Sequence, residues 1–410
     1  MVSGWTLNQW EDVLTGFTSG ATPYRGRPDY YKGTIRWVSS GELNYRLIFD
    51  TNEHISLQAL SDASLTLHSA GTFLMAITGL EAAGTRGSCA LLAEDSTTNQ
   101  SCMAIYGSDK IDIRYLYHYY VHYGDRLAFQ YCQGTKQQSY TAKIVKKLPI
   151  YYPESLSEQH HIIEALSDTD ALLIAMEKLI AKKRAIKQGA MQELLTGKRR
   201  LPGFSGEILE KELEPLCETF CDGDWIEAKD QSEEGIRLIQ TGNIGNGKYL
   251  DKSDKKRFVS ESTFIRLKCT EILPNDILVS RLPDPAGRAC LIPAGHEKAI
   301  TAVDCTIIRP HSYNPVLFVM YSQTAEYQRQ INLFLAGSTR QRISRRELGK
   351  VKVPYFDQEE QVAIASVLTD MDAEIDKLTT KLEKLRHIKQ GMMNELLTGR
   401  IRLTDQEQVS

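Results

Sequence analysis

One segment of the chain has nearly the residue types and spacing of a phosphate-binding loop. Residues 242–249 read Gly-Asn-Ile-Gly-Asn-Gly-Lys-Tyr, close to the pattern GxxxxGK(S/T), in which backbone amides and a lysine hold nucleotide phosphates. Tyr249 stands where that pattern needs a serine or threonine hydroxyl for magnesium. Asn246-Gly247 is also a strong hairpin turn. We therefore interpret the segment as a hairpin, and a nucleotide-using enzyme is not expected.

No other constellation of residues points to catalysis. The chain has no GxGxxG loop after a strand and no GxSxG nucleophile motif. It also lacks the Asp/Asn-Pro-Pro-Tyr/Phe motif with which amino-methyltransferases hold a flipped base. The eight cysteines are scattered without a CxxC pair, so we expect reduced thiols, no zinc site and no disulfide framework. We expect no catalytic residue and no metal ligand in this chain.

Two basic and polar stretches do rise above the background. Residues 134–147 and 337–346 contain no acidic residue and are rich in Gln, Arg, Lys, Ser and Thr, the side chains that contact DNA phosphates and base edges. A charge run alone is usually a solvated surface, but these two occupy equivalent places in the two halves of the chain. Together with polar residues of the predicted loops, the DNA-binding candidates are Thr22, Tyr24, Arg25, Arg27, Arg86, Gln100, Lys136, Gln137, Gln138, Lys248, Arg281, Arg288, Ser338, Arg340 and Arg342.

These stretches precede the two copies of an internal repeat. Residues 187–201 read Lys-Gln-Gly-Ala-Met-Gln-Glu-Leu-Leu-Thr-Gly-Lys-Arg-Arg-Leu, and residues 389–403 read Lys-Gln-Gly-Met-Met-Asn-Glu-Leu-Leu-Thr-Gly-Arg-Ile-Arg-Leu. The same offset of 202 residues relates Glu158-Gln159 to Glu360-Gln361. A duplication on this scale predicts two similar modules related by approximate symmetry.

Each repeat contains a long helical pattern with a narrow apolar seam. Ser155 or Ser157 and Asp357 are suitable N-caps, and Thr-Gly at 196–197 and 398–399 supplies a glycine stop. Steps of three and four residues predict two helices of about 40 residues that pack on each other; the alternative is that each covers its own domain. The seam residues are Ile162, Leu166, Leu173, Met176, Ile180, Ile364, Leu368, Met371, Ile375, Leu378 and Leu382, and the pattern continues to Ile186 and Ile388. Gly189 and Gly391 inside these helices suggest a close backbone approach.

The segments before the helices have a common frame and divergent contents. Ile35–Val38 and Ile236–Ile239 are predicted strands at equivalent places, and each leads to a glycine turn. The predicted fold class is α+β, with two α/β domains separated by two long antiparallel coiled-coil helices in an internal pseudo-two-fold repeat. The predicted boundaries are domain 1 at 1–150, helical spacer 1 at 151–204, domain 2 at 205–354 and helical spacer 2 at 355–410.

Length and composition agree with a soluble protein of several domains. The chain has 410 residues, 42% apolar and 25% charged, and a net charge of −3. No basic-then-apolar signal segment is present, and no apolar run approaches the length of a membrane span. We expect a cytoplasmic location without a membrane contact.

These motifs together resemble the specificity subunit of type I restriction-modification systems. The resemblance rests on Trp37-Val-Ser-Ser-Gly-Glu-Leu43 and on the proline-then-Glu-Gln helix entries, Pro153 to Gln159 and Pro354 to Gln361. Its most specific part is the repeated Lys-Gln-Gly-x-Met-x-Glu-Leu-Leu-Thr-Gly motif. It covers essentially the whole chain, with both copies in the expected order.

The resemblance implies a non-catalytic subunit that reads DNA. Two target-recognition domains would each read one half of a bipartite, asymmetric site in double-stranded DNA, and the helices would measure the spacer between the halves. Two methyltransferase subunits would dock on the helices with S-adenosylmethionine, and restriction subunits would join with ATP and magnesium. The chain itself would hold no cofactor.

Two other interpretations remain open on the sequence. The nearest alternative is the specificity subunit of a fused restriction-methylation enzyme that cuts on both sides of its site. A coiled-coil scaffold carrying two protein-binding β domains, with no DNA role, would explain the seam but not the matching basic stretches.

Overall fold

The computed structural model describes residues 2–80, 85–133, 138–283, 285–335 and 341–404. Its contacts divide the chain into two compact units. Unit 1 contains residues 1–177 and 380–410, and unit 2 contains residues 178–379. Each unit therefore combines one of the predicted mixed segments with parts of both predicted helical segments.

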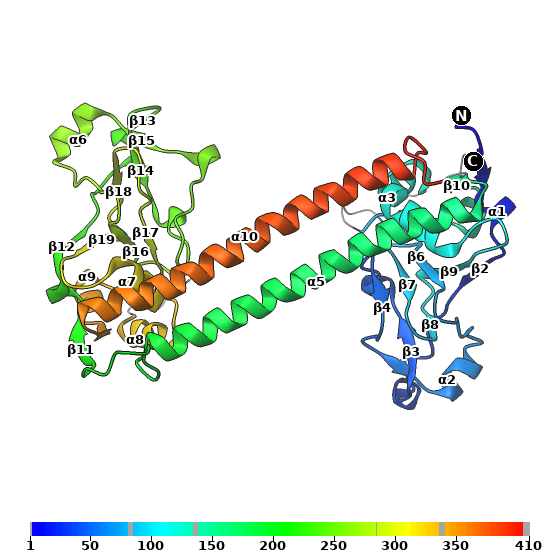
Figure 1. Cartoon of the computed structure of the whole chain (residues 1–410), viewed down its shortest axis with the longest axis horizontal. Helices are drawn as coiled ribbons and strands as arrows, with labels where there is room; N and C mark the ends of the chain where they lie inside the picture. The colour runs from blue at the N-terminus through cyan, green and yellow to red at the C-terminus, as the bar shows by residue number, and fades with distance from the viewer. Residues whose placement is uncertain (1, 81–84, 134–137, 284, 336–340, 405–410) are drawn as a thin grey trace, which may run out of the picture. The chain divides into compact units, whose positions relative to one another are not determined.

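Unit 1 is built on one larger and one smaller sheet (Figure 1). Strand β1 (Trp5–Gln9) pairs antiparallel with β10 (Pro149–Pro153), directly before the first long helix. The larger sheet has the order β2 (Gly16–Ser19), β9 (Cys102–Tyr106), β6 (Phe73–Ala76), β7 (Cys89–Leu92) and β4 (Leu47–Ile48). The smaller sheet has the order β5 (His54–Ile55), β3 (Ile35–Val38) and β8 (Ser96–Thr98). Its short helices are α1 (Trp10–Val13), α2 (Leu57–Asp62), α3 (Ile113–Tyr131) and α4 (Ala142–Lys146).

Unit 2 repeats this order of elements. Strand β11 (Leu209–Glu212) pairs with β20 (Lys352–Tyr355). The larger sheet has the order β12 (Cys217–Asp222), β19 (Cys305–Pro310), β16 (Ile277–Ser280) and β17 (Ala289–Leu291). The smaller sheet has the order β13 (Gln231–Ser232), β15 (Phe258–Val259), β14 (Ile236–Ile239) and β18 (Ala299–Thr301). Its short helices are α6 (Glu261–Leu267), α7 (Pro315–Tyr321), α8 (Ala325–Phe334) and α9 (Arg345–Gly349).

The two predicted long helices are present as α5 (Leu156–Leu194) and α10 (Gln358–Leu396), each of 39 residues. Ser155 caps the first, because its hydroxyl accepts a hydrogen bond from the Glu158 amide at 3.4 Å. Gly197 and Gly399 follow the helix ends with φ of +69° and +71°, a conformation that favours glycine. The predicted helix ends are thus confirmed.

The ends of the long helices belong to the hydrophobic cores of the units. In unit 1, Ile162 and Leu166 of α5 and Leu396 of α10 join the cluster around β6, β7, β9 and α3. In unit 2, Leu194 of α5 and Leu368 of α10 join the cluster around β16, α7 and α8. Burial of these apolar side chains fixes each sheet to the helices.

Within each unit the two long helices run antiparallel. In unit 1, Lys389 of α10 pairs with Asp170 of α5 at 2.5 Å, and Arg386 pairs with Glu177 at 2.9 Å. In unit 2, Lys187 pairs with Asp372 at 2.6 Å and Lys183 with Glu374 at 2.7 Å. Residue numbers fall along one helix as they rise along the other, so the mixed α+β class and the antiparallel helix pair are confirmed.

The predicted seam is mostly inside, with two corrections. Ile162, Leu166, Met176, Ile180, Ile364, Leu368, Ile375 and Leu382 are buried, and Leu173, Met371 and Leu378 are half-buried. Ile186 and Ile388 are 48% and 47% exposed instead, because the neighbouring lysines, Lys187 and Lys389, turn inward to their aspartates. The predicted close approach at Gly189 and Gly391 is not made within this chain, since apart from the helix's own backbone and chain neighbours no atom of the described residues lies within 4 Å of a Cβ built there.

Across the described ranges, no helix is both long and apolar enough to span a membrane. All eight cysteines are free thiols, five of them buried. Within the same ranges, no cluster of three or more His, Cys, Asp or Glu side chains could hold a metal ion.

Candidate functional site

Two of the predicted arginines of unit 1 lie on the loop after β2 and are held by acidic partners. Arg25 donates to both carboxylate oxygens of Glu53, at 2.5 and 2.8 Å, and its guanidinium lies 4.3 Å from the centroid of the Tyr31 ring. The hydrogen bond to Glu53 raises the pKa of Arg25. Arg27 pairs with Asp29 at 2.6 Å. Both side chains are exposed and fixed in direction, which suits a binding surface but does not assign one.

Other candidates of unit 1 are brought together in part. The Thr22 hydroxyl donates to the amide oxygen of Gln100 at 2.5 Å, although the two residues are 78 positions apart. Tyr24, two residues from Thr22, is exposed. Arg86 lies elsewhere, donating to the Leu80 carbonyl at 3.1 Å. Thr22 and Gln100 are therefore exposed and hydrogen-bonded to each other, Tyr24 is exposed near Thr22 in sequence, and all three stay predictions.

Two candidates of unit 2 do not fit a direct contact with DNA. Arg281 is only 2% exposed, donates to the Val303 carbonyl at 2.5 Å and lies 3.4 Å from Asp222; burial lowers its pKa. Arg288 folds back on the chain and donates to the carbonyls of Thr241, Ile244, Leu282, Pro283 and Pro285. The sequence could not distinguish these interior arginines from surface arginines, because each lies in a loop-like segment rich in proline and glycine.

Of the remaining candidates, two are exposed, one is half-buried and four lie outside the residues that the structure describes. Lys248 is exposed and pairs with Asp376 at 3.3 Å, and Arg342 is exposed and lies 3.8 Å from Asp304. Gln138 is half-buried. Lys136, Gln137, Ser338 and Arg340 lie outside the described residues, so most of the two predicted basic stretches stays a prediction.

The repeated motifs place a buried ion pair at each end of the helix pair. In unit 1, Arg402 donates to both oxygens of Glu158, at 2.5 and 2.7 Å. In unit 2, Arg200 donates to both oxygens of Glu360, at 2.6 and 2.5 Å. Both glutamates are buried, and each hydrogen-bonded carboxylate raises the pKa of its arginine. We call these two pairs the clasps.

Each clasp joins the start of one long helix to the segment that follows the other. Arg402 also donates to the Ser3 carbonyl at 2.6 Å, and Arg200 to the Gly206 carbonyl at 2.5 Å. Bidentate pairing of a planar guanidinium with a carboxylate fixes both position and direction. The clasps thus close each unit on itself.

The glutamines beside the clasp glutamates have equivalent partners in both units. Gln159 accepts from the Asp112 amide at 2.9 Å and donates to the Pro153 carbonyl at 3.0 Å. Gln361 accepts from the Asn314 amide at 2.7 Å and donates to the Phe356 carbonyl at 2.8 Å. Because Asp112 caps α3 and Asn314 caps α7, each glutamine ties a long helix to a helix of its own domain.

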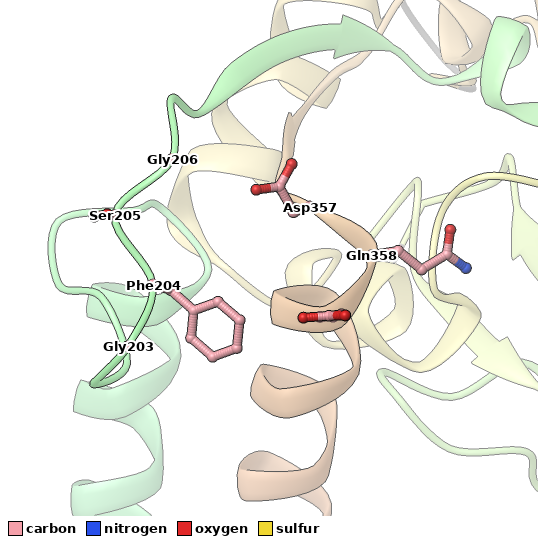
Figure 2. Close-up of a pocket in the computed structure, with 7 residues that line it drawn as sticks. Gly203, Phe204, Ser205, Gly206, Asp357 and Gln358 are labelled. Atoms are coloured by element: carbon pink, nitrogen blue, oxygen red, sulfur yellow. The ribbon is translucent and has the colours of Figure 1, made fainter.

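A surface pocket of about 480 Å³ lies beside the clasp of unit 2 (Figure 2). Its lining residues are Gly203, Phe204, Ser205, Gly206, Asp357, Gln358 and Glu359. Phe204 and Asp357 extend from opposite sides, one from the turn after α5 and the other from the start of α10 (Figure 2). The lining contains two carboxylates and no cation, so it does not suit a phosphate.

The repeats also expose an apolar residue at one matched place. Ile186 and Gly189 lie three residues apart on the outer side of α5, and Ile388 and Gly391 repeat this arrangement on α10. Residues with this spacing share one face of a helix. We call them repeat face 1 (Ile186 and Gly189, in unit 2) and repeat face 2 (Ile388 and Gly391, in unit 1).

Comparison with known proteins identifies the family. A family model described as "Type I restriction modification DNA specificity domain" matches the chain twice, at residues 3–188 and 207–387. The chain belongs to this type I specificity family. The resemblance drawn from the repeated motifs is thereby confirmed.

Two curated members of the type I specificity family come from Methanocaldococcus jannaschii. The specificity subunit of the type I restriction enzyme MjaVIII is 27% identical over 292 residues, which are 66% of this chain and 66% of that protein. The putative MjaX specificity subunit is 24% identical over 316 residues, 72% of this chain and 69% of that protein. The chain thus spans just under two thirds of the MjaVIII subunit.

Solved structures of type I systems share the fold. The S subunit from M. genitalium has a TM-score of 0.59 at 16% identity, with 96% of each chain covered. A chain solved in work on assembly and conformational transition of a type I R-M system also has a TM-score of 0.59, at 15% identity, with 98% of this chain and 99% of that chain covered. Identities this low bear on the fold alone.

The repeated motifs of the type I specificity family in this chain supply the ion pairs and hydrogen bonds that hold each unit together. The clasp arginines, the Lys187 and Lys389 ion pairs and the glutamine ties were absent from the sequence-based candidates. A signal for them was present, because each involves a residue that recurs at the offset of 202 in both halves. Recurrence of a charged residue on an apolar helix end could have indicated a buried pair.

Proposed function

We propose that the chain is the DNA sequence-recognition subunit of a type I restriction-modification complex and reads a bipartite, asymmetric target. The observation that supports this best is that the two units share one strand order but carry loops of different sequence. The strand order β2-β9-β6-β7 of unit 1 recurs as β12-β19-β16-β17 in unit 2, yet the loops on these strands share little sequence. Two similar domains with different surfaces suit two different half-sites.

In this proposal the chain is not an enzyme and holds no cofactor. Methyltransferase subunits bring S-adenosylmethionine, and restriction subunits bring the use of ATP and magnesium. The chain contributes the choice of sequence and works in the cytoplasm, where the host DNA lies. Its net charge of −3 implies that partner subunits share in neutralising the DNA phosphates.

We further propose that two methyltransferase subunits dock on repeat face 1 and repeat face 2. A glycine inside a helix costs about 1 kcal/mol relative to alanine, and both repeats keep one where this chain packs nothing against it. Beside each glycine lies an isoleucine that is about half exposed. An apolar residue next to a position without a side chain permits close approach of another helix. One such face per unit supports two copies of the partner.

The test is to co-express the chain with its methyltransferase and count the bound subunits by native mass spectrometry. Ile186→Glu should remove one methyltransferase, Ile388→Glu should remove the other, and the double variant should bind none, because a charge desolvated in the contact has no partner. Val362→Glu is the matched control, since Val362 is 54% exposed on α10 but has no apolar counterpart in the other repeat.

The same complexes decide whether DNA recognition belongs to this chain. Methylated adenines mapped in cells that carry both genes should fall in one bipartite motif and disappear without this chain. Retention of two methyltransferases by Ile186→Glu would remove repeat face 1 from the docking surface. A complex that assembles but binds no particular DNA sequence would favour the protein-binding scaffold.

A further inference from the structure

The smaller sheets of the two units carry the same arginine–aspartate pair. Arg36 lies on β3 and Arg237 on β14, each strand pairing antiparallel with one neighbour and parallel with the other. The Arg36 guanidinium lies 3.6 Å from Asp50, and that of Arg237 lies 4.0 Å from Asp251. Both pairs are separated by 14 positions in the sequence. The two domains therefore share a frame at this place.

A matched turn holds the base of the loop that carries each aspartate. In unit 1, the amide of Asn52 donates to the Glu42 side chain at 2.8 Å. In unit 2, the Asn243 side chain donates to the Leu250 carbonyl at 2.9 Å. Glu42 and Asn243 hold the same position of equivalent 3₁₀ turns after β3 and β14. Both loops are therefore tied at the base to the third residue of the preceding turn, although the hydrogen bonds differ in donor and acceptor.

The contents of the two loops differ in charge. Residues 248–257 of unit 2, here called the lysine loop, contain five cationic and two acidic residues. Residues 47–53, the equivalent segment of unit 1, contain no lysine or arginine and two acidic residues. In their place Phe49 is 65% exposed. One unit presents positive charge where the other presents an aromatic ring.

Two of the five cations of the lysine loop have no side-chain partner among the described residues, whereas Lys248 pairs with Asp376 and Arg257 donates to Gln231. The side chains of Lys252 and Lys255 make no hydrogen bond or ion pair with any residue that the structure describes. Lys256 lies 3.9 Å from Asp251, which is beyond hydrogen-bonding distance. Nη2 of the buried Arg237 likewise has no hydrogen-bond acceptor. A guanidinium donor left unsatisfied in the interior is costly, and a ligand oxygen would satisfy it.

Arg237 and Lys256 line one pocket of about 210 Å³, and its other lining residues are Tyr249, Asp251, His296 and Glu297. The Tyr249 hydroxyl lies 3.0 Å from Nε2 of His296, whose Nδ1 lies 2.7 Å from the Glu297 carbonyl oxygen. With Nδ1–H donating to that carbonyl, Nε2 is the ring nitrogen that faces the tyrosine hydroxyl. Burial raises the pKa of Tyr249, and Arg237 opposes that shift, so the hydroxyl stays a donor.

We propose that the lysine loop, together with Arg237, binds backbone phosphates of duplex DNA, and that unit 1 makes no equivalent ionic contact. The proposal rests on the proposed function and assigns the lysine loop as one of its contacts. Asp251 and Glu297 balance part of the charge in this pocket, and neither takes up Nη2 of Arg237 or the Lys256 ammonium in a hydrogen bond. Mobile lysine ammonium groups suit phosphates as point charges, and phosphate contacts position a domain without specifying a base. The two half-sites are then held by different forces, ionic at unit 2 and apolar at Phe49 of unit 1.

The test is the salt dependence of DNA binding by the complex with its methyltransferase. The triple variant Lys252→Ala/Lys255→Ala/Lys256→Ala should lower the slope of log Kd against log salt by about 2 to 3, since each phosphate contact contributes about 0.9. The recognised motif should not change. Phe49→Ala should weaken binding several-fold and leave the slope as it is.

A matched triple variant, Lys229→Ala/Lys268→Ala/Lys350→Ala, removes the same charge from exposed lysines elsewhere in unit 2 and should not alter the slope. Arg237→Lys, which keeps the charge but loses the fork of donors, should weaken binding with a smaller change in slope. An unaltered slope in the lysine-loop variant, or an equal change in the matched variant, overturns the inference. Failure of the unaltered complex to bind its motif would instead overturn the proposed function itself.

Discussion

At the scale of single residues, the clasps explain why the chain repeats an arginine three positions after each helix-stop glycine, at Arg200 and Arg402. A glutamate in the first turn of a helix would ordinarily be solvated and would favour the helix N-terminus by its charge. Here Glu158 and Glu360 are buried, and Arg402 and Arg200 neutralise them across the helix pair. The Trp5 indole adds a hydrogen bond to Glu158 at 3.3 Å.

Removing one clasp arginine should destabilise only its own unit. Arg402→Ala leaves the buried Glu158 carboxylate without its partner, which should lower the free energy of unfolding of unit 1 by about 3 kcal/mol. Arg200→Ala should do the same to unit 2. Hydrogen exchange followed by mass spectrometry would locate the loosened segments, expected at β1 and the last turn of α10 for Arg402→Ala.

Arg400→Ala is the control for this prediction. Arg400 pairs with Glu395 at 3.5 Å, and both side chains are exposed, so its loss should cost less than about 1 kcal/mol. Equal exchange in both units after Arg402→Ala would contradict the assignment of each clasp to one unit.

At the scale of elements, the sequence predicted the two long helices, their ends and their packing on each other, because apolar periodicity and capping residues act locally. Their antiparallel direction was implied by the family resemblance. The sequence analysis placed Ile186 and Ile388 in the buried seam because the seam was assigned from the spacing of apolar residues alone. The structure turns Lys187 and Lys389 inward instead, where Asp372 and Asp170 lie on the facing helix. A contact between helices separated by about 200 residues leaves no local pattern. Arg281 and Arg288 were placed on the surface because they lie in a loop-like segment rich in proline and glycine, whereas their donors bind carbonyl oxygens of the fold.

Lengthening both helices by one heptad should lengthen the recognised spacer. Insertions after Leu173 and Ile375 keep the seam in phase, because a heptad repeats its positions. Seven residues add about 10 Å, which corresponds to about three base pairs of duplex. Mapping of methylated adenines should show both half-sites unchanged and the gap between them wider. A changed half-site with an unchanged gap would contradict the ruler.

At the scale of the whole molecule, the internal repeat gives the two units the same fold, while the loops proposed to contact DNA differ. The smaller sheets, the turns after β3 and β14 and the arginine–aspartate pairs are equivalent in the two units, whereas the lysine loop and the segment around Phe49 are not. A frame fixed by clasps and cores tolerates changes in exposed loops. We therefore expect the recognised half-site to change when a whole domain is exchanged, and not when single residues are changed.

Exchange of residues 1–150 for those of a paralogue should alter one half of the methylated motif only. The exchanged segment ends within β10, so two of the five residue pairs between β1 and β10 stay within one parent sequence and the other three become mixed. Methylation-sensitive sequencing of cells carrying the hybrid would show the new half-site beside the old one. Alteration of both halves would contradict independent reading by the two units.

The division of the chain has a consequence for its synthesis. Unit 2 is one continuous stretch, residues 178–379, whereas unit 1 needs residues from both ends. Leu396 and Leu397 belong to the core of unit 1, and Arg402 reaches back 244 positions to Glu158. Domains generally fold as they leave the ribosome, so unit 2 can be complete while the first domain still waits for its last helix. A nascent chain stalled before residue 380 would expose the unfilled core of the domain that was made first.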